Sequence, residues 1–147
     1  MVSILLGSAD AIIDEAVKAL GRSHLTHHER AGLEEDRTRL QDLFTVVVDC
    51  IRDRQLAPTA RYAEALAHHR QAGGFDIGEV QVAFNVLEEA MWRRIAALAP
   101  PDQLAEAIGL LTTVLGAGKD VLARTYVALR ADQRVPSLDL SALFAGT

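Results

Sequence analysis

The sequence is short of several features on which whole classes of protein depend. It contains one cysteine, Cys50, so neither a disulfide framework nor a zinc site built from cysteines can form. It contains no apolar run of about 18 residues, the length that a membrane-spanning helix needs. Aromatic residues make up only 5% of the chain, which is little material for the walls of a haem pocket.

Basic residues are also in the minority. The chain has 15 Lys and Arg against 20 Asp and Glu, a formal net charge of −5. A nucleic-acid-binding surface needs clustered positive charge, so we expect no nucleic-acid partner. The opening residues, MVSILLG, lack the basic leader and the long apolar run of a secretory signal. We therefore expect a cytoplasmic protein with no membrane partner.

What remains is the composition of a helical domain. The chain has 147 residues, half of them apolar, which is enough for one core. Apolar residues recur at helical rather than strand spacing. The predicted fold class is all-α, as a five-helix bundle or a non-haem globin-like packing. We expect a single domain over residues 1–132 and a C-terminal tail over residues 133–147.

Five segments carry this helical spacing, and the expected helices cover residues 9–20, 33–55, 58–71, 76–98 and 102–132. Each has an apolar stripe that we expect to face the core. The stripes are Ile12, Ile13, Ala16, Val17 and Leu20; Leu33, Leu40, Leu43, Phe44, Val47, Val48 and Ile51; Tyr62, Ala65, Leu66 and His69; Val80, Phe84, Leu87, Met91 and Ile95; and Leu104, Ile108, Leu111, Leu115, Leu122, Tyr126 and Leu129.

Glycine and proline mark the ends and weak points of these helices. Gly21 is expected to close the first helix in a left-handed conformation. Gly116 and Gly118 interrupt the last helix, and a bend or a close helix crossing would explain them. Pro136 ends the regular pattern, after which Leu138, Leu140, Leu143 and Phe144 are expected to dock as one short amphipathic turn.

The histidines are the first candidates for chemistry. His24, His27 and His28 have spacings that could hold a metal on a helix, but glycines flank the segment and a solvated linker is favoured. His69 shares a face with Tyr62, and a half-buried histidine is favoured over a haem ligand. His68 could be the reactive residue of a phosphotransfer domain, but the lysine expected soon after it is missing.

The other candidates have a simpler explanation in packing. The stretch LGAGKD, residues 115–120, lacks the spacing and the hydroxyl residue of a phosphate-binding loop. Cys50 lies beside an apolar stripe and is expected to be buried and inert. Trp92 lies at the edge of the fourth stripe, where a core position is favoured over a partner contact.

One stretch carries a family resemblance. YAEALAHHRQAGGFDIGEV, residues 62–80, is followed by Phe84, Leu87 and Trp92. This pattern resembles the N-terminal sensor domain of RsbRD-type stressosome co-antagonists, a domain also found before some bacterial histidine kinases. In that family a helix ends in a His-x-x-small-Gly-Phe junction, which residues 69–79 fit with one additional glycine. The resemblance covers roughly residues 30–131.

The resemblance implies a non-haem, globin-like sensory module that is usually dimeric, has no catalytic activity and passes a signal to a C-terminal output domain. We expect the same here: no enzyme, no cofactor, a homodimer and a protein partner in a signalling pathway. The candidate signal or interface positions are His69, Arg70, Gly74, Phe75, Phe84 and Trp92. The alternative function is a small-molecule or haem carrier built on the same helical fold.

Overall fold

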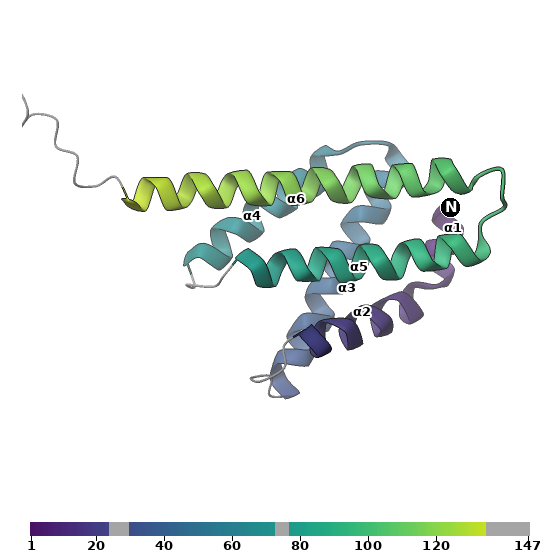
Figure 1. The fold of residues 1–147 in the computed structure, drawn as a ribbon, viewed down its shortest axis with the longest axis horizontal. Helices are drawn as coiled ribbons and strands as arrows, with labels where there is room; N and C mark the ends of the chain where they lie inside the picture. Colours follow the sequence, from purple (N-terminus) through teal and green to yellow (C-terminus); the bar gives the residue numbers. More distant parts are fainter. Residues whose placement is uncertain (24–29, 73–76, 135–147) are drawn as a thin grey trace, which may run out of the picture.

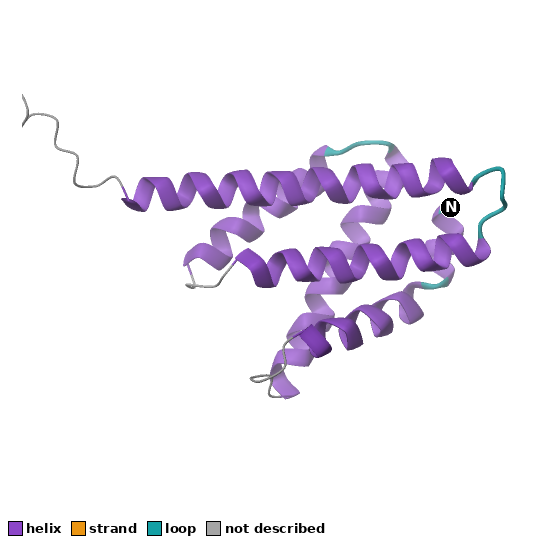
Figure 2. Cartoon of the chain, in the orientation of Figure 1, coloured by secondary structure: helices purple, strands orange, loops and turns teal. Residues whose placement is uncertain are grey.

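The computed structural model describes residues 1–23, 30–72 and 77–134 of the chain. Within these residues all regular structure is helical, as Figure 2 shows, and the prediction of an all-α protein is confirmed. The helices are α1 (Val2–Gly7), α2 (Ala9–Ser23), α3 (Arg30–Asp53), α4 (Ala57–Ala72), α5 (Ile77–Leu98) and α6 (Leu104–Arg134).

The helices form two layers (Figure 1). The nearer layer in this view holds α2, α5 and α6, with α5 between the other two. Behind them lie α3 and α4, and α4 packs chiefly against α6. The short α1 lies at the end of the bundle where α5 turns into α6. The tail beyond residue 134 and the predicted domain boundary at residue 132 stay predictions.

The large apolar side chains of α3 and α5 fill the space between the layers. All of the predicted stripe of α5 is buried, and so is the stripe of α3 from Leu40 to Ile51. On α6, Leu111, Leu115 and Leu122 are buried as predicted, while the residues at its two ends are only partly covered. Helical periodicity therefore predicts the core correctly wherever the inward residues are large.

The first helix of the bundle is one that the sequence does not reveal. Residues 2–7 form α1, so the described chain has six helices rather than five. Six residues make less than two turns, too few for a periodic pattern and too few for a helix that is stable alone. Burial of Leu5, which is fully covered by the rest of the bundle, holds α1 in place.

Gly21 does not end α2, contrary to the prediction. The helix continues through it to Ser23, whose hydroxyl donates a hydrogen bond to the carbonyl of Ala19 at 3.1 Å. A hydroxyl that bonds back to the residue four positions earlier satisfies a carbonyl of the last turn. The local structure therefore supplies a hydrogen-bond donor for a carbonyl of the helix end without a glycine cap.

The inward face of α4 was also predicted wrongly. Its buried residues are Thr59, Ala63 and Ala67, spaced four residues apart, whereas Tyr62 and Leu66 are half-buried and Ala65 is exposed. Small inward residues allow a helix to approach its neighbour closely, and the sequence pattern gives most weight to the large ones. The error thus has a steric cause, which lies in the crossing of α4 with α6.

Gly118 marks that crossing. A Cβ atom added to it would lie 2.8 Å from Cγ2 of Thr59 and 2.9 Å from Cε1 of Phe84. Thr59 in turn shares a hydrogen bond with Cys50, with 3.0 Å between Oγ1 and Sγ, and both side chains are buried. Three helices thus meet α6 at this point. Of the two explanations offered for the pair of glycines, a bend or a close crossing, the close crossing holds at Gly118, whereas Gly116 is exposed with open space above it.

The end of α3 carries the strained residue of the described backbone. Arg54 has a φ of 51°, and the next backbone N–H, of Gln55, donates to the carbonyl of Cys50 at 3.1 Å. This arrangement closes a helix with a left-handed residue, a position that usually holds glycine. An L-residue other than glycine pays roughly 1 kcal/mol or more for that conformation.

Replacement of Arg54 by glycine is therefore expected to stabilise the fold. The substitution also removes an exposed ion pair with Glu106, in which Nη2 lies 2.9 Å from Oε1. We therefore propose to make it in a Glu106→Gln background, where that pair is already absent. Urea denaturation should then show a gain of about 0.5–1 kcal/mol in the free energy of unfolding. A loss would show that the cap is not strained.

Candidate functional site

Of the six candidate positions, the structure describes the side chains of three, His69, Phe84 and Trp92, and does not bring these three together. Gly74 and Phe75 lie outside the described residues, and Arg70 lies in the last turn of α4, where the structure describes the backbone alone. The other three lie on two helices in different environments. The burial and the contacts of His69, Phe84 and Trp92 determine whether each can bind another molecule.

His69 is exposed on α4 rather than half-buried as predicted. The inward face of α4 runs through Ala63 and Ala67, and two further residues along a helix turn the side chain to the opposite side. A haem ligand must face an apolar cavity, which this position does not do. The haem-carrier alternative therefore gains no support from His69.

Phe84 is buried completely, at 0% exposure. Its ring lies against the backbone of Gly118 at the crossing of α4, α5 and α6. A side chain enclosed in this way cannot touch another molecule without rearrangement of the bundle. Phe84 therefore contributes to the core rather than to the surface.

Trp92 lies on the surface of α5 with 41% of its area exposed, so the favoured core position is wrong. One turn earlier, Glu88 forms an ion pair with Lys119 of α6. The next residue, Arg93, donates to Glu15 of α2 at 2.9 Å and to Glu89 at 2.6 Å. These pairs fix both flanks of α5 to its neighbours and leave the indole between them facing outward.

From Trp92 toward the turn between α5 and α6, beyond the Glu88–Lys119 pair and Arg93, the two helices present a surface with few charges, here named the outer α5–α6 face. Its exposed members are Trp92 and Ala96 of α5 and Gly109, Thr112 and Gly116 of α6. The two helices run antiparallel, and the Glu88–Lys119 pair sets their alignment, so one turn further along α5 places Trp92 opposite residues 115–116. The stretch 95–118 contains only two charged residues, Asp102 and Glu106, in a chain that is 24% charged.

A groove lies on another side of α6, between α6 and α4. Its charged or ionisable lining residues, here called the rim, are Glu64 and His68 on α4 and Arg124 and Asp132 on α6, and the other three lining residues, here called the floor, are Thr125, Ala128 and Leu129. The open volume is about 370 Å³. The sequence did not predict this α4–α6 groove, because its two walls are about 60 residues apart and only the tertiary structure brings them together.

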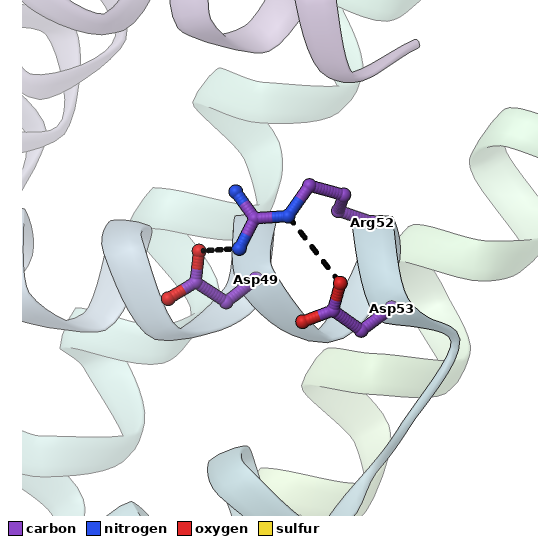
Figure 3. A network of polar contacts seen from close by, with 3 residues as sticks. All are labelled: Asp49, Arg52 and Asp53. Atoms are coloured by element: carbon purple, nitrogen blue, oxygen red, sulfur yellow. Dashed lines mark hydrogen bonds and ion pairs between the residues drawn. The ribbon is translucent and has the colours of Figure 1, made fainter.

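The last turn of α3 carries a compact polar network, shown in Figure 3. Arg52 donates to Asp49 at 2.8 Å and, less closely, to Asp53 at 3.4 Å. The hydrogen bond to Asp53 and the charge of Asp49 raise the pKa of the guanidinium above its usual value. All three residues come from one helix end and are largely exposed, so the network supports the end of α3 rather than forming a binding site.

The remaining candidates are a metal site and a membrane-spanning helix. Within residues 1–23, 30–72 and 77–134, no three His, Cys, Asp or Glu side chains are grouped closely enough to hold a metal ion. His24, His27 and His28 lie outside the described residues. None of the helices in the described part of the chain has the length and apolar character required to cross a membrane.

Comparison with known proteins gives one match. Residues 8–136 match the family described as the N-terminal domain of the RsbT co-antagonist protein RsbRD. The chain belongs to this family. No curated protein and no solved structure matches the chain.

Membership in the RsbRD N-terminal domain family confirms the resemblance drawn from residues 62–80. The matched region begins earlier than the expected 30–131 and includes all of α2 to α6. A co-antagonist domain is regulatory, so the chain is a regulatory domain related to those of the stressosome. The globin-like packing, for which no solved structure offers a comparison, stays a prediction.

Proposed function

We propose that this chain is a non-enzymatic sensory module of bacterial stress signalling that acts by forming a homodimer and by binding a protein partner. The dimer is held by the outer α5–α6 face of each copy. A two-fold dimer uses the same patch on both subunits, so one suitable surface is enough. The protein operates in the cytoplasm, without a nucleic-acid or membrane partner.

The single observation that carries this proposal is the outer α5–α6 face itself. Depletion of charge together with an exposed tryptophan distinguishes the centre of protein interfaces from ordinary surface. The two helices belong to the nearer layer of the bundle (Figure 1), and all five residues of the face are exposed in the described structure. The small residues Gly109, Thr112 and Gly116 along the same face of α6 leave room for a facing helix to approach.

The family supports the second half of the proposal. A co-antagonist works through another protein, which the family description gives as RsbT, and this favours a partner from the same signalling system. A sensor of this kind needs two states that differ in their affinity for the partner. Dimerisation through α5 and α6 would place these long helices of the two subunits in contact. A change in helix packing in one subunit would therefore alter the packing of the other.

Substitution of Trp92 by glutamate tests the dimer. The mass of the protein in solution, measured by light scattering over a dilution series, should be twice 15.9 kDa for the natural sequence at high concentration. A central interface tryptophan is worth about 2 kcal/mol or more, so Trp92→Glu should weaken association by about 30-fold or more. Circular dichroism should show an unchanged helical content, because Trp92 is a surface residue.

Leu56→Glu is the matched control. Leu56 is exposed to a similar extent, 44%, but lies in the connection between α3 and α4, away from the outer α5–α6 face. This variant should associate as the natural protein does. A natural protein that is monomeric at all concentrations, or an equal effect of both substitutions, would refute the proposed interface.

A further inference from the structure

The α4–α6 groove defined above is a second open surface of the protein, and its lining suggests that another segment binds there. Its floor of Thr125, Ala128 and Leu129 is mainly apolar, and Leu129 is only partly covered. The groove also lies at the C-terminal end of α6, since Asp132 at its rim is two residues from Arg134, where α6 ends. Whatever follows α6 along the chain therefore starts beside the groove.

The sequence that follows α6 is rich in large apolar side chains, which are more stable when buried than when exposed to water. Residues 138–144, LDLSALF, contain three leucines and a phenylalanine with one charged residue, Asp139. This segment lies outside the described residues.

The dimensions of the segment suit the groove. From Thr125 to Asp132 the groove follows α6 for seven residues, a length of about 10 Å at 1.5 Å per residue. The connecting residues 135–137 include Pro136, which favours a turn and cannot continue the helix. Four residues can span at most about 13–14 Å, so Leu138 can reach back to Leu129 from the end of α6.

The charges are also compatible with this placement. Arg124 and His68 lie on opposite walls of the groove and provide positive or protonatable groups for Asp139. The guanidinium of Arg124 already forms an ion pair with Asp120 at 2.7 Å. This pair is exposed, and the same guanidinium has further N–H groups that can bind the carboxylate of Asp139. The acidic rim residues Glu64 and Asp132 would disfavour a more acidic segment, and this one has a single acid.

We propose that residues 138–144 of the same chain bind in the α4–α6 groove and cover its apolar floor. The segment would then act as an intramolecular ligand for the face of α6 that the proposed dimer does not use. A protein partner that binds this face would have to displace it. The proposal is independent of the dimer, because the groove and the outer α5–α6 face lie on different sides of α6.

Disulfide trapping in the full-length protein tests the contact. The natural Cys50 is 1% exposed and should not react, so a pair of introduced cysteines can be followed by mass spectrometry under mild oxidation. One member is Ala142→Cys in the segment and the other is Ala128→Cys in the groove. The control pair replaces Ala128→Cys by Val127→Cys, at the same level of α6 but outside the groove lining and 66% exposed.

An intramolecular bond should form at least about tenfold more readily with the cysteine at position 128 than with that at 127, the ratio expected for docking favoured by 1.4 kcal/mol. Serine at both Leu143 and Phe144 should reduce the yield at position 128 to that of the control. Equal yields at the two positions, an unchanged yield in the serine variant, or bonds formed only between two chains would overturn the proposal. The last outcome would identify the occupant as the segment of a second copy.

Discussion

Replacement of Phe84 by alanine is expected to lower the free energy of unfolding by about 3–5 kcal/mol, the usual cost of truncating a buried phenylalanine. The ring is completely enclosed and touches Gly118 of α6, so its loss leaves a cavity where several helices meet. Surrounding side chains can fill such a cavity only in part, because the neighbouring positions Thr59 and Gly118 are small. Urea denaturation of the purified variant measures the loss.

The neighbouring residue provides the control for Phe84. Asn85 is exposed on the same helix, and its replacement by alanine should change the stability by less than about 0.5 kcal/mol. The comparison also separates a core role from an interface role. If Phe84→Ala left the stability unchanged but altered the mass of the protein in solution, Phe84 would be an interface residue and its buried position would be wrong.

Replacement of Gly118 by alanine should also destabilise the fold, by about 1–3 kcal/mol. Helix propensity alone predicts the opposite, a gain of about 1 kcal/mol for alanine over glycine in a helix interior. The contacts decide the sign, because the new Cβ would lie 2.8 Å from Cγ2 of Thr59 and 2.9 Å from Cε1 of Phe84. Both neighbours are buried, so α4, α5 and α6 would have to move apart.

Two further substitutions make the test of Gly118 specific. Gly116→Ala, on the same helix with nothing within 4 Å of the added carbon in the single chain, should raise the stability when it is measured at a concentration where the protein is monomeric, because Gly116 lies in the outer α5–α6 face. Thr59→Ser removes the clashing Cγ2 and keeps the hydroxyl that bonds to Cys50, so it should recover part of the loss caused by Gly118→Ala. Additive effects of Thr59→Ser and Gly118→Ala would show that the two positions do not interact.

Prediction from the sequence succeeded where large apolar side chains face the core. The stripes of α3 and α5 combine leucine, valine, isoleucine and phenylalanine at helical spacing, and their buried residues are those expected. It failed on α4, where alanine and threonine face inward, because a pattern of side-chain size cannot show how closely two helices approach. It also missed α1, whose six residues are held by tertiary contacts.

Less of the candidate site than of the core could be predicted from the sequence. The pattern of residues 62–80 was sufficient to identify the family, and the match to residues 8–136 confirms it. The roles of single residues were not accessible in the same way, since His69 and Trp92 were both expected to be more buried than they are. Whether a residue at the edge of a stripe is covered depends on where the neighbouring helices lie.

The order and type of the residues alone determined that this chain is helical, which side chains of α3 and α5 turn inward and to which family it belongs, because these properties depend on spacing along one helix or on a short local pattern. The packing of the helices decided which surfaces stay open. The outer α5–α6 face and the α4–α6 groove each combine residues from two helices, and only the arrangement of those helices in space brings such residues together.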